Sequence, residues 1–246
     1  MAANTFGVSV CITAYNATRF IKECLDSVAQ QTWFRERDNY EILVGVDNDQ
    51  KTMRYLQKIM TQYKNLRVFM MNSNEGTYIT MNTLIYLTKY DFVVRFDADD
   101  IMHANCIEEA MNLRNRYDFV RFKFRNFYET DFRWNHEVLI AHGIGMFRKS
   151  TLRHYGCFRP WRIAADTELL YRLKAFIRCG CSESVSFSRR VYDGSLTTAQ
   201  NTKMRSPIRQ YYTSIIKSAR YPTAVSAIIP CVTNSFSEIY PKPVAK

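Results

Sequence analysis

The chain has 246 residues, of which 47% are hydrophobic and 14% aromatic, so it can bury the core of one large or two small domains, and a disordered chain is excluded. Lys and Arg outnumber Asp and Glu by 34 to 23, which gives a net charge of +11 and a pI of about 9.3. This charge suits an anionic ligand, a membrane surface or a nucleic acid, but the basic residues are scattered, so we expect no dedicated nucleic-acid-binding arm.

No charged-then-apolar signal opens the sequence, and no apolar run approaches the roughly 20 residues that span a bilayer. We therefore expect a cytoplasmic protein, with membrane association left open. No paired CxxC occurs and the four histidines form no ligand motif, so nothing indicates a zinc site.

Strands and helices are expected to alternate four times over the first 100 residues. Continuous apolar and β-branched runs at 8–13, 41–46, 66–71 and 91–97 predict buried strands. Apolar residues at three- and four-residue spacing predict a helix after each of the first three strands. This order predicts an α/β fold with a mostly parallel, Rossmann-like sheet, in which ligands bind beyond the carboxyl ends of the strands. No GxGxxG or GxxxxGK[ST] occurs, so a dinucleotide-redox site or a P-loop is not expected.

The second half is expected to be a smaller subregion. The pattern predicts a helix after Asp100, strands at 118–127, 140–147 and 185–191, and helices that begin at Ser150 and near Asp166. We expect one domain over residues 1–201, made of a nucleotide-binding half (about 7–103) and an acceptor half (about 104–201), followed by a helical tail at 202–246.

Basic and apolar residues alternate in the tail on one expected amphipathic helix. The basic members are Arg205, Arg209, Lys217 and Arg220. We favour a helix that packs on the domain with a solvated basic face. Contact with an anionic membrane or a partner is the alternative.

Three acids end the fourth strand within four residues: Asp97, Asp99 and Asp100. Neighbouring carboxylates repel each other, so a cation is expected beside them. Mn²⁺ or Mg²⁺ with a phosphorylated ligand would meet this need, because hard cations take oxygen ligands. The alternative is a solvated turn in which Asp99 or Asp100 caps the next helix. The motif alone favours the turn, whereas its place at a strand end favours the cation.

Five motifs in order over about residues 7–197 resemble the family-2 inverting glycosyltransferases of the GT-A fold: VSVCITAYN, EILVGVDND, NEGTYITMN, RFDADD and FRPWRIAADTELLYR. The resemblance implies metal-dependent transfer of a sugar from a nucleoside diphosphate, with UDP expected, to a hydroxyl of a glycan, glycoprotein or lipid. A sugar-phosphate nucleotidyltransferase is an alternative, but its glycine-rich basic loop is missing after the first strand. A non-catalytic basic binding module is another, but it leaves the acids unexplained.

The resemblance also assigns site residues. It places Thr13, Ala14, Tyr15, Asp47, Asn74, Gly76, Asp97 and Ala98 at the nucleotide. Tyr15 is expected to stack on the base and Asp47 to accept from the N3–H of uracil. Asp99, with Asp97, would hold Mn²⁺ or Mg²⁺, and Asp166 would be the general base.

Each assignment has a simpler alternative. Tyr15 could be a core aromatic, Asp47 a turn residue and Asp166 a helix N-cap. Glu168 is the rival base, two residues along the same helix. The flat side chains of Trp134 and Trp161, with Arg162, could form a saccharide platform, and ordinary packing is the alternative.

The sequence departs from the family pattern at three positions. Ala165 stands where the family has a Glu before the base, and Met81 where a basic residue is usual. Tyr192 replaces a histidine that often completes the metal shell, so we expect weak metal binding without nucleotide.

Overall fold

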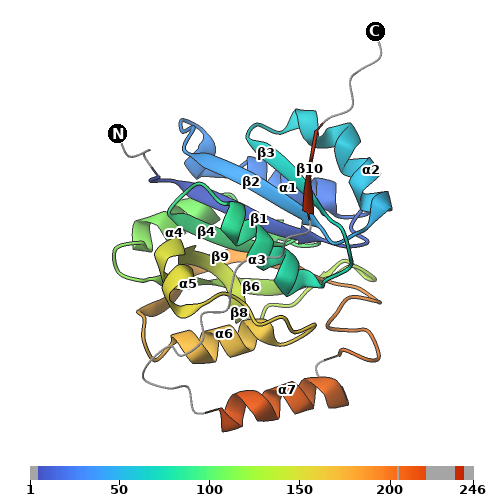
Figure 1. Cartoon of the computed structure of the whole chain (residues 1–246), viewed down its shortest axis with the longest axis vertical. Coiled ribbons are helices and arrows are strands. Elements are labelled where there is room, and N and C mark those ends of the chain that lie inside the picture. The colour runs from blue at the N-terminus through green and yellow to red at the C-terminus, as the bar shows by residue number, and fades with distance from the viewer. Residues whose placement is uncertain (1–4, 204, 220–235, 241–246) are drawn as a thin grey trace.

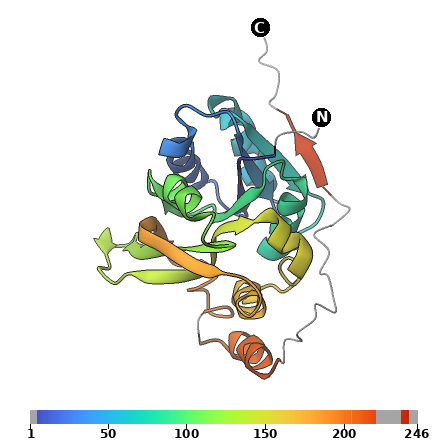
Figure 2. The ribbon, with the colours of Figure 1, turned by 90° about the vertical axis from the view of Figure 1, so that its left-hand side faces the viewer.

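The computed structural model describes residues 5–203, 205–219 and 236–240. Its centre is one mixed sheet with helices on both faces (Figure 1, Figure 2). In the described chain the strand order is β10-β3-β2-β1-β4-β8-β6-β9-β5, and β7 pairs with β6. The expected α/β architecture with a sheet and flanking helices is confirmed.

The first four long strands are parallel neighbours, as predicted. They are β1 (Val8–Ala14), β2 (Tyr40–Val46), β3 (Leu66–Met71) and β4 (Phe92–Asp97). The crossovers hold α1 (Ile21–Ala29), α2 (Gln50–Ile59) and α3 (Thr77–Leu87), with short 3₁₀ helices η1 (Thr32–Phe34) and η2 (Met60–Gln62). Every residue of β1 and β2 is buried, which is why these strands read as unbroken apolar runs rather than as alternating ones.

The second half extends the same sheet with long strands. They are β6 (Phe119–Tyr128), β8 (Leu139–Arg148) and β9 (Cys179–Val191). β8 runs antiparallel to both β4 and β6. Its approach to β6 depends on Gly145, because a Cβ there would lie 2.3 Å from the carbonyl oxygen of Val120. Two short strands were not expected from the sequence, β5 (Ile101–Met102) and β7 (Arg133–Trp134).

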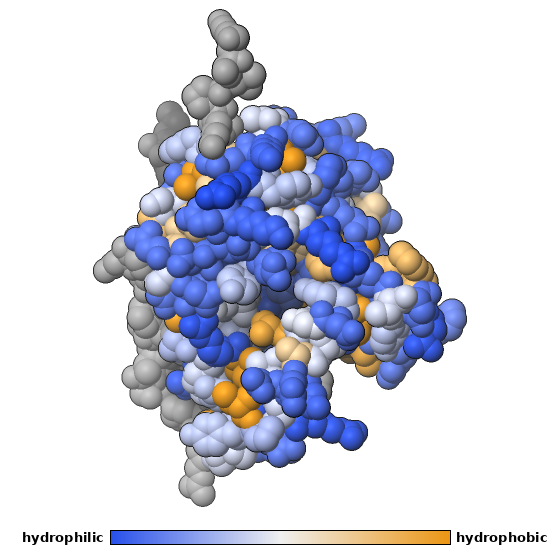
Figure 3. Space-filling model, turned by 90° about the vertical axis from the view of Figure 1, so that its right-hand side faces the viewer, coloured by the Kyte–Doolittle hydropathy of each residue, from blue (hydrophilic) through white to orange (hydrophobic). Residues whose placement is uncertain are grey.

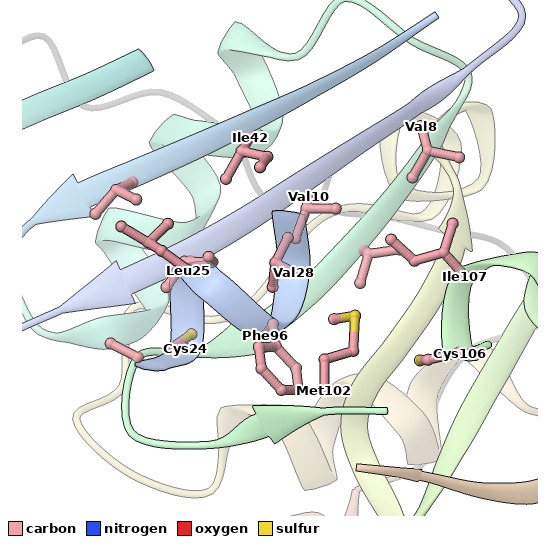
Figure 4. Close-up of a cluster of buried hydrophobic side chains, with 14 of the residues drawn as sticks. Val8, Val10, Cys24, Leu25, Val28, Ile42, Phe96, Met102, Cys106 and Ile107 are labelled. Carbon is pink, nitrogen blue, oxygen red and sulfur yellow. The ribbon is translucent and has the colours of Figure 1, made fainter. Parts of the chain in front are cut away.

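Two apolar layers flank the sheet. One contains α1, α2 and α4 (Cys106–Leu113), and Figure 4 shows Leu25, Val28 and Ile107 of this layer beside Val10 and Phe96 of the sheet. The other contains α3, α5 (Lys149–Tyr155) and α6 (Ala165–Leu173). The second layer therefore brings α3 of the first half against α6 of the second.

The described part of the expected tail holds one helix and one strand. In α7 (Pro207–Ser218), Ile216 is buried and the Tyr212 ring lies 4.6 Å from the Trp161 ring, so the helix packs on the second half of the chain, which is the arrangement that the sequence analysis favoured. The unexpected β10 (Phe236–Ile239) pairs antiparallel with β3. Arg220 lies outside the described residues. No helix in the described part of the chain is long and apolar enough to cross a membrane. A membrane contact of α7 stays a prediction.

Candidate active site

The carboxyl ends of β1, β2 and β4 meet at one edge of the sheet (Figure 1). Figure 3 looks at this side of the molecule and shows a hollow in its surface. The loops that follow these strands carry most of the residues that the sequence assigned to a nucleotide. The location of a nucleotide site at these loops stays a prediction.

The residues after β1 reach the site in different ways. Tyr15 is 63% exposed, so it is not a core aromatic and its ring is open for stacking. The Thr13 hydroxyl lies 2.7 Å from that of Thr77 at the start of α3. Ala14 and Ala98 are buried as whole residues, so each shows a ligand little surface of its own.

Asp47 holds the loop before α3. Its carboxylate accepts the backbone N–H of Glu75 at 2.7 Å and that of Gly76 at 2.9 Å. Asp47 itself is buried, with only 4% of its surface exposed. The Thr80 hydroxyl donates to it at 3.3 Å. These bonds give the turn-residue alternative direct support, and the bond to uracil stays a prediction. Gly76 has a φ of 90°, a backbone conformation that favours glycine.

Arg162 joins the two halves of the chain at this loop. Its Nη1 donates to the Asn74 side-chain oxygen at 2.6 Å, and its Nη2 donates to the Asn74 carbonyl at 2.8 Å. Trp161 packs on Tyr212 instead of standing free. Trp134 is exposed on β7, 4.9 Å from the Phe127 ring. Of the three platform candidates, the structure thus ties only Arg162 to a residue assigned to the nucleotide.

The acids after β4 have three different environments. Asp97 accepts from Arg95 Nη2 at 2.8 Å, Asp99 accepts from the Tyr192 hydroxyl at 3.0 Å, and buried Asp100 accepts the Arg190 N–H at 2.9 Å. The N-cap of α4 is Asn105. The alternative of a solvated turn with Asp99 or Asp100 as the cap is therefore wrong.

The acid cluster concentrates negative charge in a partly buried turn. Burial and then the charge of Asp97 raise the pKa of Asp99 to about 6, and burial followed by Asp99 raises the pKa of Asp100. Carboxylate oxygens are ligands that Mg²⁺ and Mn²⁺ take, so the chemistry of Asp97 and Asp99 fits such an ion. The described residues contain no group of three His, Cys, Asp or Glu side chains placed to hold a metal by themselves, so ligand oxygens would have to complete the shell.

Asp166 lies in the first turn of α6 but does not cap it. The N-cap is Ala164, which has a left-handed backbone with φ 64°, so the capping alternative is wrong. Asp166 Oδ1 accepts from the Tyr78 hydroxyl of α3 at 2.9 Å. On its other side lies Gly143 of β8, where a Cβ would come within 2.5 Å of the Asp166 Cβ.

Glu168 is held in a buried ion-pair cluster and is only 1% exposed. Its Oε1 lies 3.0 Å from Arg159 Nε and 3.0 Å from Arg172 Nε. Arg172 also donates to the backbone carbonyls of residues 155–157. Glu168 therefore fixes the loop before α6 and is poorly placed to meet an acceptor.

The sequence reasoning missed two residues that connect the site. Arg95 is a charge inside an apolar run, and that irregularity was the signal that could have revealed a buried ion pair. Tyr78 looked like any apolar residue of a core helix, and only the fold brings it to Asp166. His142, whose Nδ1 lies 3.0 Å from the Thr167 hydroxyl beside Asp166, had no sequence signal.

A parallel half-sheet that ends in acids and continues into a mixed half is the GT-A architecture of nucleotide-sugar enzymes, and solved structures share it. TarS of S. aureus in complex with UDP-GlcNAc superposes with a TM-score of 0.66 at 17% identity, over 77% of this chain and 60% of TarS. The mannosyltransferase PcManGT of Pyrobaculum calidifontis, in complex with GDP-Man and Mn²⁺, superposes with a TM-score of 0.64 at 17% identity, over 87% of this chain and 65% of PcManGT. At this identity the likeness shows the fold alone.

The family follows from the sequence match. Residues 9–215 match the model of glycosyl transferase family 2, so the chain belongs to that family, as the five motifs indicated. Glycosyltransferase AglE of Haloferax volcanii is 31% identical over 107 residues, 43% of this chain and 34% of AglE. Chondroitin synthase of Escherichia coli is 28% identical over 106 residues, 43% of this chain and 15% of the synthase. The matched segment thus spans about a third or less of these relatives.

The Glu168 cluster predicts a large stability effect. Glu168→Gln leaves Arg172 buried without its carboxylate, and breaking a buried ion pair from one side costs about 3–5 kcal/mol. We expect urea unfolding to show a loss of this size. The exposed pair of Asp38 with Lys64 provides the control, since Asp38→Asn should leave the unfolding midpoint unchanged. Equal stability of the two variants would contradict the structural role of Glu168.

Proposed function

We propose that this chain transfers a sugar from a UDP-sugar to a hydroxyl of a glycan, glycoprotein or lipid acceptor, with inversion at the anomeric carbon and with a divalent metal. One observation carries the proposal. The acid turn after β4 and the carboxylate of Asp166 are linked by two side chains, because Arg95 pairs with Asp97, its guanidinium lies 5.8 Å from the centre of the Tyr78 ring, and the Tyr78 hydroxyl bonds Asp166. A family-2 fold with acids on both sides of one site suits a two-substrate transfer.

The donor side is assigned to the strand ends. Tyr15 would stack on the base, and Asp47 with Asn74 and Gly76 would form the wall beside it. Asp99 and Asp97 would hold Mn²⁺ or Mg²⁺, which when bound offsets the negative charge of the diphosphate. The solved complexes support both parts of the assignment, since TarS was solved with UDP-GlcNAc and PcManGT with Mn²⁺. PcManGT also contains GDP-Man, so guanine is the competitor to test.

The acceptor side is assigned to Asp166. Its carboxylate would take the proton of the acceptor hydroxyl as that oxygen bonds to the anomeric carbon. The bond from this carbon to the diphosphate oxygen breaks on the opposite face, so UDP leaves and the configuration inverts. Glu168 does not compete for this role, because its charge is already shared with Arg159 and Arg172.

A panel of nucleotides tests the donor. We expect UDP and one UDP-sugar with Mn²⁺ to raise the unfolding temperature more than GDP, GDP-Man or ADP at the same concentration, because a ligand that binds the folded state stabilises it by RT ln(1 + [L]/Kd), which grows as Kd falls. Tyr15→Ala is the matched variant, and it should reduce the shift given by UDP without changing the temperature of the free protein. A larger shift with ADP than with UDP would show that the base pocket is misassigned.

Replacement of Asp99 tests the metal assignment. Asp99→Ala should abolish Mn²⁺-dependent UDP release from the best donor of the panel, while the fold survives because the loss of one carboxylate relieves repulsion in the cluster. Asp131→Ala, at an exposed acid, is the control and should behave as wild type. Normal Mn²⁺-dependent turnover by the Asp99 variant would rule out this ligand.

Replacement of Asp166 tests the base. General-base catalysis contributes about 10²- to 10⁴-fold in rate, so Asp166→Asn should lower turnover by at least about a hundredfold. Donor affinity in calorimetry should stay within a few-fold, because the amide keeps the size and can still accept from Tyr78. Asp193→Asn, at an exposed acid of the second half, should keep its turnover. A near-normal rate for Asp166→Asn would show that another residue is the general base.

A further inference from the structure

Tyr78 is the one described side chain of α3 whose hydroxyl bonds the carboxylate of Asp166, across 88 residues of sequence. The tyrosine is 6% exposed, so the bond lies under the surface of the site and not at its rim. Burial and then the charge of Asp166 hold the pKa of Tyr78 well above its usual range. The phenol therefore stays protonated, which means that it donates a hydrogen bond and cannot itself act as the base.

The ring of Tyr78 is held against Phe158, a residue of the loop that leads into α6. It stacks on Phe158 with ring centres 5.5 Å apart and an interplanar angle of 29°. One turn further along α3, Asn82 donates to the Phe158 carbonyl at 2.8 Å and accepts the Phe158 N–H at 3.0 Å. Since Phe158 belongs to the loop that leads into α6, α3 sets the position of that loop and of Asp166 together.

Two further contacts lie around this bond. From β4, the buried Arg95 guanidinium lies 5.8 Å from the centre of the Tyr78 ring, and it pairs with Asp97. From β8, His142 bonds Thr167, the neighbour of Asp166. Arg95 therefore ties the Tyr78 ring to the acid turn after β4 as well as to the loop of Phe158.

We propose that Tyr78 is the positioning residue of the general base: its hydroxyl binds Oδ1 of Asp166 and thereby aims Oδ2 at the acceptor hydroxyl. This inference rests on the proposed function, in which Asp166 takes the acceptor proton. A base that is held at one oxygen keeps one orientation, and a loss of orientation at a reacting group lowers the rate far more than it lowers binding.

Tyr78→Phe removes the hydroxyl and keeps the ring on Phe158. We expect kcat to fall about tenfold or more with an unchanged KM for the donor, because the loss affects the transition state and not donor binding. The KM for the acceptor, measured at saturating donor and Mn²⁺, should also stay within a few-fold of wild type, because the bond orients the base and does not bind the acceptor. Thermal unfolding establishes that the variant is folded.

Tyr63→Phe is the matched control. Tyr63 is also a buried tyrosine that donates to an aspartate, Asp26, at 2.7 Å, but it lies in the layer of α1 and α2 away from Asp166. Tyr63→Phe should cost stability and leave both kcat and KM unchanged.

The outcomes separate this inference from the function on which it rests. If Asp166→Asn is inactive and Tyr78→Phe shows wild-type kcat, Tyr78 does not position the base. A fall in kcat by Tyr78→Phe that Tyr63→Phe matches, or a rise in KM in place of a fall in kcat, would also overturn the inference, because the first reports a loss of stability and the second a loss of binding. If Asp166→Asn remains active, the base assignment fails first.

Discussion

The arrangement of the site depends on one buried cation in the sheet. Arg95 lies within β4 and is 5% exposed, where an unpaired charge would be costly. The cost is offset by the carboxylate of Asp97 at 2.8 Å and by the ring faces of Tyr78 and Phe158 at 5.8 and 5.9 Å. Because these partners come from the acid turn, from α3 and from the loop before α6, the requirement to satisfy one guanidinium brings three segments together.

Three contacts across the two halves follow the same pattern. Asn74 meets Arg162, Tyr78 meets Asp166, and Asn82 meets the backbone of Phe158. In each of them a residue of α3 or of its preceding loop bonds a residue of the segment 158–166. The position of the base assigned to the acceptor side is therefore set by the element assigned to the donor side, and the two cannot be altered independently.

The sequence predicted the parts of the fold that repeat a simple pattern. β1 to β4 are buried on both faces, so their apolar runs are strong signals, and the alternation with helices fixed the order of the sheet's parallel half. β5, β7 and β10 have two to four residues each, too few to show a period. β10 also pairs with a strand far away in the chain, and no local signal indicates such a partner.

The site was predicted unevenly for a related reason. Position at a strand end indicated Asp47, Asp97 and Asp99, and the resemblance indicated Asp166. The partners could not be predicted, because Asp47 bonds residues 28 and 29 positions away and Tyr78 bonds one 88 away. The sequence also allowed Asp166 to be an N-cap, because it did not show where the helix begins. The left-handed Ala164 is the N-cap, two residues before Asp166, and a non-glycine residue in that conformation is not expected from sequence.

The strand β10 has a consequence for how copies of the protein behave toward each other. In the described part of the sheet, β3 would end the row of strands without it, and an edge with free N–H and C=O groups is a template for pairing with another chain. β10 covers that edge with four residues, and its Glu238 places a carboxylate 2.9 Å from Arg67 of β3. The new edge is short and carries a charge, two features that discourage strand-to-strand addition. A segment that the sequence analysis treated as a tail thus leaves Val68–Met71 of β3 with a partner strand in place of a free edge.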